Sequence, residues 1–279
     1  MRRPRGGVHR GAIRRAGRYH QWEDSLSSEK IDRVNESATY ICHVVSTAAL
    51  DSQTRRAMCD LYLSCYEATT PELFEGDLLS KDEVLLLHSG PRLVGFTTLK
   101  VFEAAWQGED IRVVFSGDTV VDRQHWGQQA LSLNWVRRMG QIKRLQPEKR
   151  LVWFLLVKGH RTYRYLQVFA KRFHPREGDH DPSLAALADH LARQQFHDDY
   201  NPASGLVEFV PSRGQLKRDL AEPRPDEMSR PGVAYFLQRN PGFRLGHELV
   251  CVCDMEEGNM KPMTLRLFRQ GCNGSTREL

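Results

Sequence analysis

The stretch "SGDTVVDRQHWGQQALSLNWVRRMGQI", residues 116–142, decides the fold because it joins a strand pattern to a helix pattern through one short polar turn. Its first residues end a strand-like run that begins near residue 110. After the turn, Leu131, Trp135, Met139 and Ile142 recur at the spacing of one apolar helix face. We therefore predict a strand, a turn around Gly127, and an amphipathic helix that packs against a core.

The flanking sequence contains further strand and helix patterns. Asp51 looks like an N-cap, and the run "RLVWFLLVKG" (150–159) is typical of a strand buried on both faces. Strands are predicted at 38–48, 83–88, 93–106, 110–121, 150–159, 206–210 and 246–255. Helices are predicted at 51–67, 69–80, 128–142, 160–173 and 183–196. This order indicates an α+β (α/β-like) fold with a mixed, mostly antiparallel sheet and helices on both faces.

The chain divides into three parts by composition. Residues 1–22 hold seven arginines and no acid, so we expect a disordered tail; a transit peptide, a nucleic-acid-binding arm and a plain solvated extension remain open. Residues 23–175 carry the predicted core. Residues 176–279 read as a helical insertion and late strands that complete the same domain. No apolar run approaches the roughly 20 residues of a membrane-spanning helix, and a cytoplasmic protein is expected.

Positive charge is concentrated in residues 137–172, which hold eleven Lys or Arg and a single acid, Glu148. The whole chain is +5. A local positive field of this kind suits a phosphate-bearing small molecule or an acidic partner protein. The six cysteines contain no C-x-x-C pair, so we expect free thiols and no metal site.

The turn around Gly127 has the properties of an anion site. A helix that begins after a strand presents unpaired N–H groups and the positive end of its dipole. A glycine lets the backbone come close to a phosphate. The sequence therefore predicts that this turn binds a phosphate or pyrophosphate group.

The same turn resembles the acyl-CoA signature of the GNAT acyltransferase superfamily, Gln/Arg-x-x-Gly-x-Gly/Ala. Here the signature reads Gln124-His-Trp-Gly127-Gln-Gln129, and Ala130 follows. Gln129 departs from the family, which has a small residue at its position. The resemblance extends over the order of elements in residues 38–175.

The resemblance implies an acyl-CoA cosubstrate, acetyl-CoA or a longer acyl-CoA, and no metal. It implies that the strand ending at Val121 separates from the strand 150–159, so that the pantetheine arm inserts between them. The residues expected to bind the donor are Val120, Val121, Arg123, Gln124, Trp126, Gly127, Gln128, Gln129, Ala130 and Arg161.

Three residues are candidates for the catalytic steps that acyl transfer requires. Asp118, just before the turn, is the candidate base, and His125 could titrate near neutral pH. The family's usual tyrosine proton donor is replaced here by Phe169, and we expect Tyr163 to take its place.

The leading hypothesis is transfer of an acyl group from acyl-CoA, or from an acyl-carrier protein, to an amine of a small molecule or a protein. A non-catalytic GNAT-like module that binds an acyl donor or a partner is the alternative. A nucleic-acid-binding protein that uses its basic tail is a weaker one, because no nucleic-acid-binding motif accompanies the tail.

Overall fold

A computed structural model describes residues 39–274, so the predicted tail at residues 1–22 lies outside the described residues. The strands are β1 (Tyr40–Ser46), β2 (Tyr66–Glu67), β3 (Glu83–Ser89), β4 (Arg92–Trp106), β5 (Glu109–Val121), β6 (Leu151–Val157), β7 (Tyr200–Asn201), β8 (Leu206–Val207), β9 (Gln215–Leu216) and β10 (Glu248–Asp254). The helices of nine or more residues are α2 (Ser52–Cys65), α3 (Pro71–Leu79), α4 (Ala130–Leu145), α5 (His160–Phe169), α6 (Pro182–Phe196), α8 (Pro231–Arg239) and α9 (Pro262–Cys272).

Eight strands form one sheet in the order β1-β3-β4-β5-β6-β10-β8-β7, and β2 pairs with β9 in a separate two-stranded sheet. Every neighbouring pair in the large sheet is antiparallel except β5 and β6, which are parallel. The predicted fold class, a mixed and mostly antiparallel sheet with helices on both faces, is confirmed.

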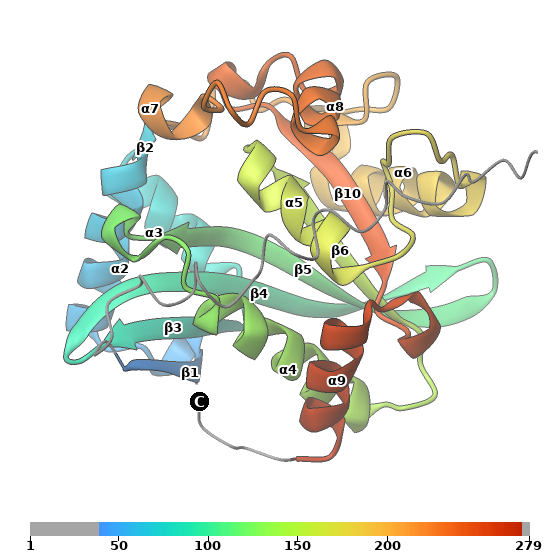
Figure 1. The fold of residues 1–279 in the computed structure, drawn as a ribbon, viewed down its shortest axis with the longest axis horizontal. Helices are drawn as coiled ribbons and strands as arrows, with labels where there is room; N and C mark the ends of the chain where they lie inside the picture. Colours follow the sequence, from blue (N-terminus) through green and yellow to red (C-terminus); the bar gives the residue numbers. More distant parts are fainter. Residues whose placement is uncertain (1–38, 275–279) are drawn as a thin grey trace, which may run out of the picture. The chain divides into compact units, whose positions relative to one another are not determined.

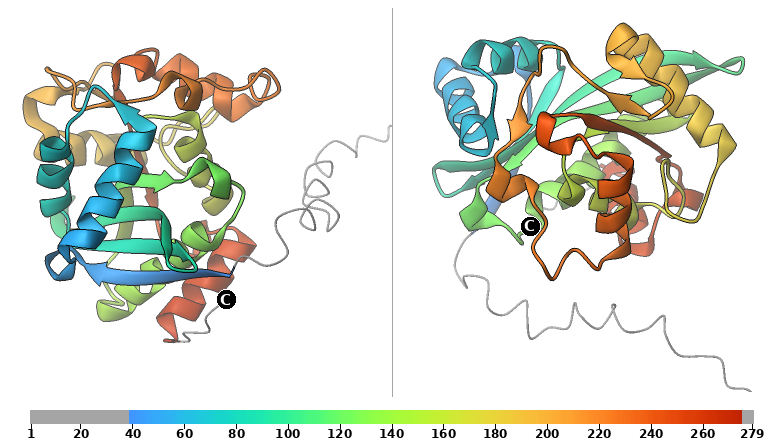
Figure 2. Two further views of the ribbon diagram at one scale, coloured as in Figure 1. Left: turned by 90° about the vertical axis from the view of Figure 1, so that its left-hand side faces the viewer. Right: turned by 90° about the horizontal axis from the view of Figure 1, so that it is seen from above.

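Helices cover both faces of the sheet because the central strands alternate buried side chains toward each face. Trp153 and Leu155 of β6 pack in the cluster that contains α4, α5, α8 and α9. Val152 and Phe154 of the same strand pack against α6 on the opposite face. There α2 and α3 cover the part of the sheet formed by β3, β4 and β5. Figure 2 shows these layers, with α2, α3 and α6 on one side and α4, α5 and α9 on the other.

Most predicted elements are present, with shifted ends. Asp51 is the N-cap of α2 and accepts a hydrogen bond from Thr54 N, as its place in the sequence indicates. The predicted helix 160–173 ends earlier, at Phe169, because Ala170 turns to an extended conformation and bridges to Met260. The predicted strand 206–210 is reduced to the two residues of β8. Two helices, α8 and α9, were not predicted.

The C-terminal part of the chain contributes to the central sheet. β10 lies between β6 and β8, and α9 packs on α4, where a Cβ on Gly140 would lie 2.0 Å from Phe268 O (Figure 1). All six cysteines are free, and Cys251 and Cys253 are buried in β10. Within residues 39–274, no helix combines the length and the apolar character needed to cross a membrane.

Candidate active site

The site begins where β5 and β6 part. Their parallel pairing runs from Arg112 and Leu151 to Ser116 and Leu155, and it stops there. Beyond that point β5 continues to Val121 paired with β4 alone, while β6 continues to Val157 paired with β10 alone. The two strands therefore separate, as the GNAT resemblance implies.

A β-bulge lies at this parting. Thr97 pairs with Thr119 and Leu99 with Ser116, so Gly117 and Asp118 together oppose the single residue Thr98. A bulge bends its strand and turns the side chain of the extra residue. A Cβ on Gly117 would lie 2.4 Å from Thr98 Oγ1 and 2.6 Å from Lys81 Cε, so only glycine fits. The dipeptide Gly117-Asp118 thus places a carboxylate where the strands diverge.

Charged and phenolic groups from several elements surround Asp118; we name them, with Asp118, the Asp118 cluster. They are Tyr62 of α2, Tyr66 of β2, Asp77 of α3, Lys81 before β3, Lys158 after β6 and Glu248 of β10. Burial and the carboxylate of Asp77 raise the pKa of Asp118 to about 7, although Lys158 and Lys81 oppose the shift. A carboxyl group that titrates near neutral pH suits a general base.

The two tyrosines of the cluster stack on each other with ring centroids 4.4 Å apart. Tyr62 is 3% exposed and Tyr66 is 8% exposed. Burial and the charge of Asp118 raise the pKa of both phenols, so both stay protonated at neutral pH. Sequence reasoning did not select them, because only the tertiary fold brings α2 and β2 to the parting of β5 and β6.

The turn between β5 and α4 leaves several backbone N–H groups without an acceptor. Asp122 caps the short 3-10 helix Arg123–His125 through a hydrogen bond from Gln124 N, and α4 then begins without a side-chain cap. Within the described residues, no hydrogen bond is made by the N–H groups of 127–130. Gly127 has a φ of +95°, and nothing lies within 4 Å of the place its Cβ would take. This geometry leaves room for an anion.

Three cationic or aromatic side chains lie beside the turn. The indole of Trp126 is 39% exposed and donates from Nε1 to Val121 O. The guanidinium carbons of Arg161 and Arg123 lie 4.8 Å and 5.7 Å from its ring centroid. The first turn of α5 therefore joins the turn 122–129 in one positively charged site.

Residues 212–230, which we name the α7 segment, contact both arginines. The segment contains β9 and the short helix α7 (Arg218–Ala221). Asp219 lies 2.8 Å from Arg123, and Arg161 donates to Leu220 O and lies 3.5 Å from Glu227. Sequence analysis placed this polar, Pro-rich stretch in an insertion. In the structure its carboxylates form ion pairs with Arg123 and Arg161, the two cations beside the turn 122–129.

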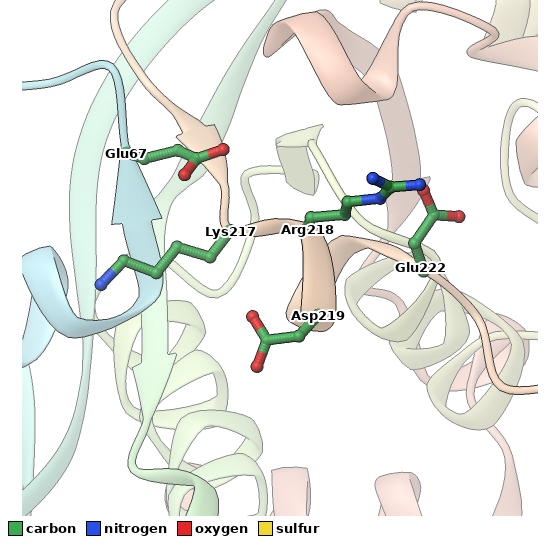
Figure 3. A pocket seen from close by; sticks show the side chains of 5 residues that line it. All are labelled: Glu67, Lys217, Arg218, Asp219 and Glu222. Carbon is green, nitrogen blue, oxygen red and sulfur yellow. The ribbon is translucent and has the colours of Figure 1, made fainter.

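A depression of about 590 Å³ lies at the α7 segment. It is lined by Glu67, Lys217, Arg218, Asp219 and Glu222. In Figure 3 the guanidinium of Arg218 extends toward Glu222, and the carboxylate of Asp219 points away from both. The lining thus combines both signs of charge directly next to the ion pair of Arg123.

The side chains of two predicted catalytic residues make their contacts outside the Asp118 cluster. Tyr163 is 1% exposed, and its hydroxyl donates to Pro175 O at 2.7 Å among the aromatic rings of α8. The structure thus places Tyr163 in the core, and its role as proton donor stays a prediction. His125 hydrogen-bonds through Nδ1 to the hydroxyl of Tyr40 on β1, at 3.0 Å. Of the predicted donor-binding residues, Val120 is buried.

The positive segment 137–172 is largely neutralised by the rest of the fold. Seven of its eleven cations form ion pairs with carboxylates outside the segment: Arg138–Glu83, Lys143–Glu256, Lys149–Glu103, Arg150–Asp254, Lys158–Glu248, Arg161–Glu227 and Arg172–Asp181. The broad positive field expected from the sequence is thus reduced, and Arg161 beside the turn 122–129 is itself one of the paired cations.

No family model and no curated protein matches the sequence. Solved structures that match include a probable N-acyltransferase from Enterococcus faecalis (15% identity, TM-score 0.37). The match covers 48% of this chain and 33% of that chain. The GNAT family N-acetyltransferase YhbS from Escherichia coli, in complex with CoA, matches at 13% identity with a TM-score of 0.36 over 47% of this chain and 70% of that one. Arabidopsis thaliana NAA60 with acetyl-CoA matches at 13% identity with a TM-score of 0.37, over 51% of this chain and 93% of that one.

Proposed function

We propose that the protein is an acyltransferase that takes an acyl group from an acyl-CoA thioester and transfers it to an amine. The observation that carries the proposal is the position of Asp118. Its carboxyl group, with a pKa of about 7, lies where β5 and β6 part. Only a few residues later in the chain, the N–H groups of 127–130 have no acceptor among the described residues.

In the proposed reaction the N–H groups at the start of α4 and the side chains of Arg123 and Arg161 bind the pyrophosphate of the donor. The acyl thioester lies between β5 and β6. The acceptor nitrogen attacks the thioester carbonyl carbon and loses a proton to Asp118, directly or through a water molecule. The carbon–sulfur bond breaks, and the thiolate leaves and takes a proton from solvent.

Binding and turnover test the two parts of this proposal separately. Isothermal titration with CoA and acetyl-CoA is expected to give saturable binding to the wild type. Gly127→Val should weaken it, because a β-branched residue is strained at a φ of +95°. Gly90→Val, at a positive-φ turn with the same open surroundings, is the matched control. Absence of binding by every acyl donor would contradict the proposal.

Turnover is measured as thiol release from acetyl-CoA with a panel of amines. Asp118→Asn should lower kcat/KM by about 10²- to 10⁴-fold while the affinity for CoA is retained. In the wild type, kcat/KM should rise with pH through about 7, because the base acts in its ionised form.

A non-catalytic module that binds an acyl donor is the second candidate. The burial of Tyr163 favours it, because the hydroxyl group expected to donate the proton already donates a hydrogen bond to Pro175 O. This alternative predicts binding of CoA together with no thiol release for any amine, and no effect of Asp118→Asn on either measurement.

A further inference from the structure

A partly buried ion pair belongs to the Asp118 cluster, at the point where β5 and β6 part. Lys158 Nζ lies 3.3 Å from Glu248 Oε1, and the two side chains are only 13% and 11% exposed. Lys158 follows the last residue of β6 and Glu248 begins β10, and the pairing of Leu249 with Val157 holds them side by side. The ammonium group also lies 5.4 Å from the ring centroid of Tyr66.

Among the described residues, neither charge of this pair forms an ion pair with the turn 122–129 or the α7 segment. Burial opposes the charge on Lys158, but Glu248 and Asp118 outweigh it, and the pKa of Lys158 is raised. Burial raises the pKa of Glu248, although Lys158 opposes this shift. Because partial burial weakens solvent screening, each of these charges acts strongly on Asp118.

We propose that Lys158 and Glu248 are positioning residues that set the charge state of Asp118 as the base of the reaction. This inference rests on the proposed function, since that function makes Asp118 the base. Lys158 favours the carboxylate of Asp118, and Glu248 both disfavours it directly and holds the ammonium of Lys158. The two residues therefore act on Asp118 with opposite signs.

Of the other groups around Asp118, the carboxylate of Asp77 has the largest effect and raises the pKa of Asp118. Lys81 donates to Asp77 Oδ1 at 2.7 Å and to Ser80 Oγ at 2.9 Å, so Asp77 neutralises much of its charge. Tyr62 and Tyr66 stay neutral near pH 7. The Lys158–Glu248 pair is thus the part of the Asp118 cluster that can be changed without altering the contacts of α3.

The test is the titration of Asp118, followed by NMR of protein labelled with ¹³C at the aspartate carboxyl and assigned with Asp118→Asn. Glu248→Gln should lower the pKa of Asp118 by about one unit, a tenfold change in its proton dissociation constant. Lys158→Met should raise it by about as much. The double variant Lys158→Met with Glu248→Gln should return it close to the wild-type value.

The matched control is another Lys–Glu pair, Lys149 with Glu103, at the opposite end of β4 and β5. Lys149→Met and Glu103→Gln should leave Asp118 unchanged. Lys158→Arg should keep the wild-type titration, because it retains the charge. If Lys158→Met does not fold, Glu248→Gln and Lys158→Arg still decide the question.

Shifts of equal sign in the two single variants, or no shift in Glu248→Gln, would overturn the inference. The titration needs no acyl donor, so it is independent of the proposed function. Where acyl transfer is measured, the pH at which kcat/KM rises should move in the same directions as the titration. A kinetic profile that stays fixed while the titration moves would instead contradict the proposed function, because Asp118 would then not be the base.

Discussion

At the scale of single residues, Asp118 makes stability depend on pH. Its folded pKa of about 7 lies above its ordinary value of 3.8, so the folded protein binds this proton more tightly than the unfolded chain. The contribution to stability is complete below about pH 4 and is lost as the pH rises through about 7. An ionised, partly buried carboxylate therefore lowers the free energy of unfolding at pH 8.

We predict that Asp118→Asn stabilises the protein at pH 8 by roughly 1–3 kcal/mol and has little effect at pH 4. Thermal unfolding followed by circular dichroism at both pH values measures this difference. Asp110→Asn, at the exposed start of β5, is the control and should not change the pH dependence. An equal effect of Asp118→Asn at both pH values would show that its charge is not responsible.

The sequence indicates Asp118 as a candidate, but the bulge that positions it needs partners far along the chain. A glycine inside a strand pattern is a known sign of a bulge, and "SGD" carries that sign. The reason for the glycine is the side chain of Lys81, which reaches over it from before β3. Likewise, nothing near Lys158 in the sequence points to Glu248, since the pair forms only when β10 joins β6.

At the scale of elements, strong local sequence patterns were sufficient to predict most of the helices and strands. The apolar stripe of α4 and the continuous apolar run of β6 are buried as their periodicity predicts. α9 was missed although Thr264, Leu267, Phe268 and Gly271 follow a helical spacing. The α7 segment has no such pattern, and its role follows only from its contacts with Arg123 and Arg161.

We predict that the α7 segment competes with the acyl donor for Arg123. The Arg123–Asp219 pair has both side chains more than 60% exposed, so it is worth at most about 1 kcal/mol. Asp219→Asn should therefore tighten the binding of CoA by about two- to fivefold in isothermal titration. Asp226→Asn is the control on the same segment, because Asp226 pairs with Arg224 and Arg230 instead. Weaker binding of CoA by Asp219→Asn would contradict the competition.

The contact between α4 and α9 depends on two glycines. A Cβ on Gly140 would lie 2.0 Å from Phe268 O, and one on Gly271 would lie 2.0 Å from Arg137 O. We predict that Gly140→Ala lowers the free energy of unfolding by about 1–3 kcal/mol in urea titration, because the helices must move apart. Gly76→Ala in α3, where nothing lies within 4 Å, should instead be neutral or stabilising by up to about 1 kcal/mol. Equal effects of the two substitutions would exclude this explanation.

At the scale of the whole molecule, the part of the chain after residue 175 belongs to the core rather than to an appended unit. In the sheet β6 lies between β5 and β10. Without β10, the backbone N–H and C=O groups of β6 on that side have no partners. Phe236, Leu267 and Phe268 fill the same cluster as Trp135 and Trp153.

We therefore predict that residues 39–175 do not fold when they are produced alone, although the resemblance to GNAT enzymes is confined to them. Scanning calorimetry of this fragment should show no cooperative transition, whereas residues 39–274 should unfold in one. Addition of CoA should not rescue the fragment, because β6 still lacks its partner strand β10. A cooperative transition in the fragment would mean that the sheet is stable with one side of β6 unpaired. The strands after residue 175 would then contribute to the site and not to the stability of the core.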